Sequence, residues 1–302
     1  MRLLRSLGYL LVFVFSFVVF LYLMFPYDAL KDRAIVAIEE QLGGNVQVSI
    51  ETFEPYYLSG VEISKMNIDL TEQGQVSPLL RINEATGRAG LISLLMGRPN
   101  ISFWLRSGKG ELEGSVSQRE GLWDIELFFD RFDLSALAFL QSRFGLNVNS
   151  AIDGDVALRF DQQAMARSTG DVNLTFPSLS LAESEFPIGD DTIPVPALVF
   201  SQGENSKLDA KVEKGTIALQ KLVFAGGDLG VDLSGKIFMS ATPANFRLNL
   251  NGSFSASEKL GEALPFLFIV EKQKRADGTY PLTITGRLAK PNVKIGSFTL
   301  PL

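Results

Sequence analysis

The feature that most constrains this chain is an uncharged apolar run near its start. No charged residue lies between Leu7 and Phe25, and the run is rich in Leu, Val and Phe. As a helix it would be about 28 Å long, close to the thickness of the hydrocarbon core of a bilayer. Arg2 and Arg5 precede the run, and positive charge is retained on the cytoplasmic side of a membrane. We therefore expect a single membrane span with a cytoplasmic N-terminus.

A cleaved signal peptide is the alternative interpretation of this run. Its apolar core would be shorter, and small residues would precede the cut, whereas Met24 to Asp28 shows no such pattern. Without cysteine the chain cannot be a lipoprotein. We therefore expect a retained anchor within residues 1–27, formed by the large apolar side chains of the run: Leu7, Leu10, Leu11, Phe13, Phe15, Phe17, Val18, Phe20, Leu21, Leu23 and Phe25.

The absence of both cysteine and histidine excludes several kinds of chemistry. Disulfides, Ser-His-Asp triads and the usual zinc sites cannot form. Acidic pairs such as Glu111/Glu113 alternate as they do on the solvated face of a strand. Asp190-Asp191 could supply half of a calcium site, but no EF-hand spacing provides the other oxygens. We expect no enzyme, no catalytic or metal site and no cofactor, and a net charge of −6 without a basic face predicts no nucleic-acid partner.

A helix is expected directly after the apolar run, from Asp28 to Leu42, because Gly43-Gly44 would end it. Its apolar stripe is Leu30, Ala34, Ile38 and Leu42. The polar face is mixed in charge rather than basic, which favours packing against the body over lying on a bilayer.

From Val46 onward the apolar period changes to two, which is typical of strands. Short strands separated by Gly, Asn, Asp and Pro predict a largely antiparallel sheet. They are expected at Val46–Ile50, Val61–Leu70 (with one slip), Ile101–Leu105, Glu111–Ser117, Leu122–Phe129, Val156–Phe160, Val172–Phe176, Ala197–Ser201, Lys207–Val212, Thr216–Phe224, Leu229–Met239, Phe246–Phe254 and Leu282–Leu288. Helices are expected at Leu91–Met96, Leu134–Phe144 and Glu258–Lys274.

One pattern recurs along the strands, an apolar residue on each side of a glycine at a spacing of two. It predicts bulges or bends where the sheet curls, although ordinary strand glycines would look the same. The flanking residues are the candidate lining of an apolar groove, or else the core of a sandwich: Leu112, Val116, Ile152, Val156, Leu233, Ile237, Leu250, Phe254, Ile284 and Leu288. Trp104 and Trp123 could form a carbohydrate platform, but burial as large aromatic side chains is the favoured interpretation.

The expected fold class is therefore mainly β with a few helices. An N-terminal transmembrane helix is followed by a long, curled, largely antiparallel sheet, which forms either an open groove or an open sandwich. The proline-rich segment Phe186–Pro196 is expected to be a loop and the boundary between two parts of the body, residues 28–185 and 186–302.

Three segments of the chain resemble a known family. They are Phe25–Leu30 after the apolar run, Leu219–Ile237 with its Gly226-Gly227-Asp228, and Asp277–Pro291. Together they resemble protein N of the bacterial type II secretion system, and the match covers most of the chain in order. The family also resembles the AsmA-like envelope proteins, whose curled sheets form an apolar groove for lipids. The family offers no catalytic residues to transfer to this chain.

The resemblance implies a cell inner-membrane protein with a single span and a periplasmic body. The expected function is that of an accessory component of a type II protein secretion system, acting through contacts with other secretion-apparatus or envelope proteins. The alternative is an AsmA-like lipid-binding or lipid-transfer protein, with phospholipid as its partner.

Overall fold

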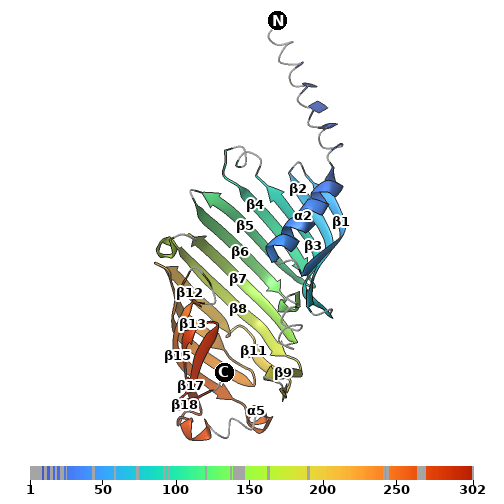
Figure 1. The fold of residues 1–302 in the computed structure, drawn as a ribbon. Helices are drawn as coiled ribbons and strands as arrows, with labels where there is room; N and C mark the ends of the chain where they lie inside the picture. The colour runs from blue at the N-terminus through green and yellow to red at the C-terminus, as the bar shows by residue number, and fades with distance from the viewer. Residues whose placement is uncertain are drawn as a thin grey trace.

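Antiparallel strands make up most of the chain in the computed structural model (Figure 1). The structure describes residues 9, 12–13, 16–17, 19–20, 24, 26–42, 45–57, 59–72, 75–90, 93, 96–119, 121–136, 138, 147–161, 164–188, 191–240, 242, 245–263 and 270–300. The mainly β class with few helices is confirmed, and 16 strands form one antiparallel sheet.

The strands of the described part are β1 (Val46–Tyr56), β2 (Gly60–Glu72), β3 (Gln75–Ala89), β4 (Asn100–Ser107), β5 (Gly110–Arg119), β6 (Leu122–Phe132), β7 (Val148–Phe160), β8 (Thr169–Leu181), β9 (Ser184–Ile188), β10 (Asp191–Val195), β11 (Leu198–Gln202), β12 (Lys207–Glu213), β13 (Thr216–Phe224), β14 (Leu229–Phe238), β15 (Arg247–Ala256), β16 (Tyr280–Arg287), β17 (Lys290–Ile295) and β18 (Phe298–Thr299). The helical segments are α2 (Tyr27–Leu42), η1 (Leu134–Ala136), η2 (Met165–Arg167), α5 (Glu258–Ala263) and η4 (Glu271–Gln273).

Nearly every strand pairs with its neighbour in sequence, so the sheet is a meander from β1 to β18. The exception is β8, whose first half pairs with β12 and whose second half pairs with β11. The segment expected to be a loop, Phe186–Pro196, instead contributes to a separate hairpin of β9 and β10. The sheet itself continues past this hairpin from β8 to β12, and the expected division of the body at this point stays a prediction.

Helix α2 packs against the first strands, as its mixed charge predicted (Figure 1). Its Ile35 and Ile38 contact a cluster built on Val46, Val48, Ile50 and Ile68. The predicted stripe is partly wrong, because Leu30 is 38% exposed and Ile35 takes its place in the contact. The side chain of Leu42 lies outside the described residues.

Of the expected membrane anchor, the structure describes Phe13, Phe17 and Phe20, which are helical and between 52% and 67% exposed. The other anchor residues named above lie outside the described residues. Within the described part of the chain, no helix is both long enough and apolar enough to cross a membrane.

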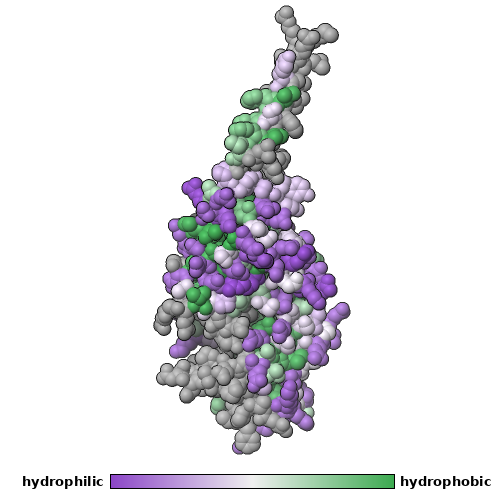
Figure 2. Space-filling view, turned by 90° about the vertical axis from the view of Figure 1, so that its right-hand side faces the viewer, coloured by the Kyte–Doolittle hydropathy of each residue, from purple (hydrophilic) through white to green (hydrophobic). Residues whose placement is uncertain are grey.

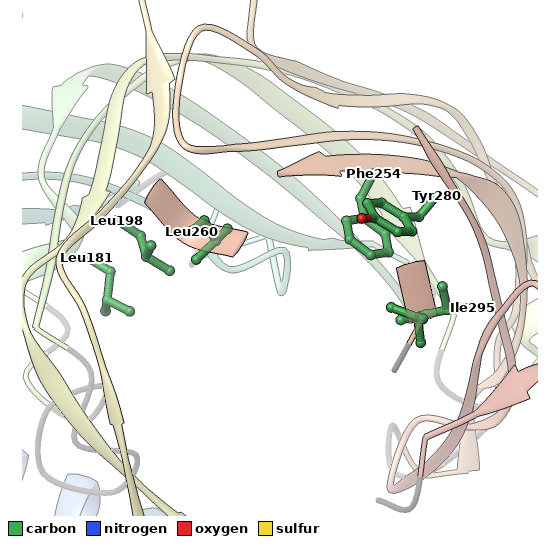
Figure 3. Close-up of a cluster of buried hydrophobic side chains, with 7 residues drawn as sticks. Leu181, Leu198, Phe254, Leu260, Tyr280 and Ile295 are labelled. Atoms are coloured by element: carbon green, nitrogen blue, oxygen red, sulfur yellow. The ribbon is translucent and has the colours of Figure 1, made fainter. Parts of the chain in front are cut away.

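The sheet curls so that β8 and β11 face β15 to β17 across its interior (Figure 3). Leu181 and Leu198 point inward from one wall, and Phe254, Tyr280 and Ile295 from the other. Leu260 of α5 lies between the walls and is 2% exposed, and Val270, before η4, is fully buried. The C-terminal part of the sheet therefore has a packed apolar cluster at the end that carries α5 and η4.

Candidate functional site

The register of the sheet aligns apolar residues of successive strands into continuous rows. The longest row takes one residue from each of 15 strands, and every member is apolar or glycine. Its members are Phe53, Ile63, Ala85, Leu105, Leu112, Phe129, Gly154, Leu174, Leu208, Leu222, Leu233, Gly252, Leu282, Ile295 and Phe298. Since side chains alternate between the two faces of a strand, such a row defines one face of the sheet.

Two further rows lie on the same face. One runs through Val61, Gly87, Phe103, Gly114, Leu127, Val156, Val172, Ala210, Leu219, Gly235, Leu250, Ile284 and Val293. The other runs through Ala89, Ile101, Val116, Ile125, Leu158, Gly170, Val212, Ile217, Ile237, Leu248, Gly286 and Pro291. We call the three rows together the apolar face.

The opposite side of the sheet, which we call the polar face, is hydrophilic over the same strands. One of its rows reads Arg88, Ser102, Ser115, Glu126, Ala157, Asp171, Lys211, Ala218, Lys236, Asn249, Thr285 and Asn292. Its ion pairs are mostly exposed, for example Arg106 with Glu111 at 2.9 Å. Exposed pairs of this kind contribute little to stability, so the main effect of these charged residues is to keep this face of the sheet solvated.

The apolar face is covered unevenly along the sheet. In β12 to β17 several of its residues are buried, among them Ala210, Leu219, Leu233 and Leu250, which form one cluster. In β4 to β8 no residue of the three rows is buried: Ile101 is 49% exposed and the others are half-buried. We call this part the central apolar face.

Nine of the ten predicted groove residues lie on the same side of the sheet, the apolar side. Leu112, Val116 and Val156 belong to the central apolar face, whereas Leu233, Leu250 and Phe254 are buried. Ile152 pairs with Phe132 and is buried, and Ile237 and Ile284 are half-buried. Leu288 departs from the prediction, because β16 ends at Arg287 and Leu288 lies in the following turn, 50% exposed.

The repeated glycines interrupt the ladder at two positions. Gly154 and Gly235 have φ of 133° and 143°, a backbone region that side chains other than glycine rarely adopt. Beside Gly154 the partner strand shifts register between Phe129 and Phe132, and beside Gly235 it shifts between Leu219 and Leu222. The predicted irregularity is therefore confirmed at these two glycines, while Gly114 and Gly252 lie in regular pairing.

The two tryptophans are not part of one platform, because they lie on opposite faces. Trp104 pairs with Glu113 in a row of the polar face. Trp123 has the same parity as Ile125 and Leu127 on β6, so it belongs to the apolar side. Sequence reasoning missed this difference, since parity between strands depends on the register.

Among the described residues, the carboxylate-bearing Asp161 is buried and Asp228 is partly buried. No group of three or more acidic side chains in this described part of the chain is placed to hold a metal ion. The most buried carboxylate, that of Asp161, accepts a hydrogen bond from the Ala164 N–H at 2.9 Å and pairs with Arg167. Asp228 accepts bonds from the Val199 N–H and the Ser257 hydroxyl. Both carboxylates thus connect backbone segments.

Comparison with models of protein families, with curated proteins and with solved structures finds no match for this chain.

Proposed function

We propose that this chain is an inner-membrane-anchored protein of the cell envelope whose central apolar face binds the acyl chains of lipids. The observation that carries the proposal is the continuity of the three apolar rows together with their incomplete burial in β4 to β8. Contiguous apolar surface beyond a few hundred Å² is rare on soluble monomers and marks interaction sites.

The chemistry of this surface fits an acyl chain. The three rows over β4 to β8 contain only aliphatic residues, phenylalanine and glycine, and so offer no side-chain hydrogen bond to a ligand. A ligand held there gains from removing apolar area from water, at about 25 cal/mol per Å². An acyl chain meets this condition along its whole length.

The membrane anchor is supported by the uncharged run from Leu7 to Phe25. Its described aromatic residues, such as Phe13, are exposed, which is costly in water and favourable in lipid. Figure 2 shows hydrophobic residues, in green, along this N-terminal segment. In this proposal the anchor keeps the sheet beside the bilayer from which lipids are drawn, and the body is periplasmic.

The test uses two adjacent phenylalanines on opposite faces. Phe129 lies on the apolar face, and Phe128 lies on the polar face, 56% exposed. The photoreactive residue benzoylphenylalanine is placed at either position of the full chain, which is reconstituted with vesicles of phosphatidylethanolamine and phosphatidylglycerol. After illumination, mass spectrometry should find lipid adducts for position 129 and far fewer for position 128. Equal labelling at both positions, or none at 129, would refute lipid binding by this face.

A second function is favoured by the free edge of the sheet near its C-terminal end. Among the described residues, β18 covers only the last two positions of β17, so the outer backbone of Lys290–Asn292 has no paired strand. A free edge can accept a strand from a partner. With the resemblance to protein N, this supports an accessory role in a type II secretion system, in which partner subunits add to β17.

The secretion role is tested by photo-crosslinking from Asn292 in cells that carry a type II secretion system. Benzoylphenylalanine at Asn292 should crosslink to a subunit of that system, and the same probe at Asn249, exposed within the sheet, is the control. Crosslinks to no secretion subunit would exclude this edge as the contact.

A further inference from the structure

A hollow lies over β3 to β6 and is lined mostly by residues of the polar face, while Phe103, Gly114 and Leu127 of the apolar rows also border it. Its volume is about 440 Å³, within the range of about 300–1,000 Å³ that is usual for small-ligand sites. The small residues Ser102, Gly114 and Ser115 contribute to its lining. Because these residues are small, they leave room between the larger side chains around them.

Aromatic side chains line the hollow, which is unusual for a face that is otherwise hydrophilic. Trp104 and Phe128 belong to the same cross-strand row, separated by Glu113, and Tyr56 contributes a third ring. Phe128 lies on the polar face and is 56% exposed, whereas the neighbouring apolar residues of β6 lie on the other face. An exposed aromatic row of this kind has no role in the core of the sheet.

The indole of Trp104 is held in place by two residues, Glu111 and Arg106, that do not line the hollow. Its N–H donates to Glu111 at 3.1 Å, and the guanidinium of Arg106 lies 4.9 Å from the ring centroid. Glu111 is in turn paired with Arg106 at 2.9 Å. The indole bond and Arg106 both lower the pKa of Glu111, which keeps this carboxylate charged and the indole in place.

Hydrogen-bonding groups of both kinds surround the rings. The carboxylates of Glu113 and Glu126 are acceptors, and within the described part of the chain neither makes an ion pair or a side-chain hydrogen bond. Arg88 is a hydrogen-bond donor, and the hydroxyl groups of Ser102 and Ser115 can each donate and accept. The ligand must therefore present donors, acceptors and an apolar surface for stacking.

We propose that this hollow binds a saccharide, with a pyranose ring stacked on Trp104 and its hydroxyls bonded to Glu113 and Glu126. Sugar hydroxyls donate to carboxylates and accept from Arg88 and the serines, and the C–H faces of the ring pack on aromatic rings. A small anion is opposed by the two carboxylates. An organic cation would be attracted by the carboxylates and the rings, but it would offer no acceptor to Arg88 and the two serines. This inference does not depend on lipid binding, because Trp104, Glu113 and Glu126, which carry it, all lie in rows of the polar face.

The experiment uses the two tryptophans as separate reporters, in the full chain kept in a sugar-free zwitterionic detergent. In the Trp123→Phe variant, Trp104 is the sole tryptophan, and in Trp104→Phe only Trp123 remains. Cellobiose, maltose and N,N′-diacetylchitobiose are titrated while fluorescence is recorded. At least one disaccharide should change the emission of the Trp123→Phe variant saturably and leave that of Trp104→Phe unchanged.

A double variant, Glu113→Gln with Glu126→Gln, should weaken that binding roughly tenfold or more, because bonds to charged groups are lost. These residues are exposed, so the fold should survive, and an unchanged circular dichroism spectrum checks this. Co-sedimentation with insoluble chitin or cellulose would identify the ligand as a polymeric glycan. Binding of a disaccharide without co-sedimentation would identify it as a free oligosaccharide. No saturable signal with any disaccharide, or equal signals from both single-tryptophan variants, would overturn the proposal. So would binding of tetramethylammonium without any disaccharide.

Discussion

The phenol hydroxyl of Tyr280 lies 2.5 Å from a carboxylate oxygen of Glu271, and this bond ties η4 to β16. The ring of Tyr280 also stacks on Phe254, with centroids 4.9 Å apart, inside the cluster that closes one end of the curled sheet. The residue thus joins the closing segment to the wall of the sheet by both a polar and an apolar contact.

The first prediction concerns stability at high pH. Burial, with the bond to Glu271 added, raises the pKa of Tyr280 from 10.0 to about 12. The folded state therefore favours the neutral phenol. This stabilisation is complete below pH 10 and is lost as the pH rises from 10 toward 12. Absorbance titration of the six tyrosines should show one phenol ionising late, and Tyr280→Phe should abolish that step. Tyr57→Phe, at an exposed site, should not. A late step that persists in Tyr280→Phe would contradict the assignment.

The second prediction compares two glycines on the apolar face. A Cβ at Gly252 would lie 1.9 Å from the carbonyl oxygen of Asp232, whereas a Cβ at Gly87 would meet nothing within 4 Å. Gly252→Ala should lower the free energy of unfolding by about 1–3 kcal/mol, because the backbone must shift to relieve the clash. Gly87→Ala should leave it nearly unchanged. Urea denaturation of the full chain measures both, and equal effects would show that β14 and β15 can separate at no cost.

The third prediction concerns the connection between β7 and β8. Asp161 is 1% exposed, and its carboxylate accepts from the Ala164 N–H and from Arg167. Asp161→Ala should destabilise the chain by about 1–3 kcal/mol, because a backbone donor loses its partner. Arg167→Ala should also destabilise the chain, because it leaves a carboxylate that is 2% exposed without its counter-ion. Its cost should be the smaller one, since Arg167 is itself 63% exposed and the bond from the Ala164 N–H to the carboxylate stays. Thermal unfolding of the two variants checks the order, and a larger loss for Arg167→Ala would contradict it.

The fourth prediction concerns the N-terminal edge of the sheet. Glu39 of α2 accepts a hydrogen bond from the Val48 N–H at 2.8 Å, so the helix covers part of the outer backbone of β1. Glu39→Ala should speed the exchange of the Val48 amide hydrogen, because that donor becomes open to water. Hydrogen exchange followed by mass spectrometry measures this change. Glu40→Ala, whose side chain is exposed, should leave the exchange of β1 as it is. If both variants exchange alike, Glu39 does not protect the edge.

Period-two alternation predicted most strands, because strands of a sheet with one solvent-exposed face and one apolar face alternate polar and apolar residues. The prediction missed the short strands β9, β10, β17 and β18, and it failed over the whole length of β3 (Gln75–Ala89). Pro78 interrupts the pattern, and the apolar positions change parity between Ile82 and Ala85. The slip expected in β2 is confirmed at Lys65, whose φ of 49° breaks the alternation.

The apolar face was predicted only as a set of residues, and its continuity could not be. Each row depends on pairing between strands, and register shifts such as that beside Gly154 decide which residues become neighbours. The polar-face hollow was missed for the same reason. Trp104, Glu113 and Phe128 belong to three strands and become neighbours only through the register.

The meander has a consequence for how the chain can reach its native state. Because almost every strand pairs with the one before it, few long loops must be closed at an entropic cost before the sheet can form. Synthesis starts at the N-terminus, so each new strand can pair with the free edge of the strand before it as soon as it is made. The two pairings of β8 with later strands have to wait, since β9 and β10 precede β11, and β11 also precedes β12.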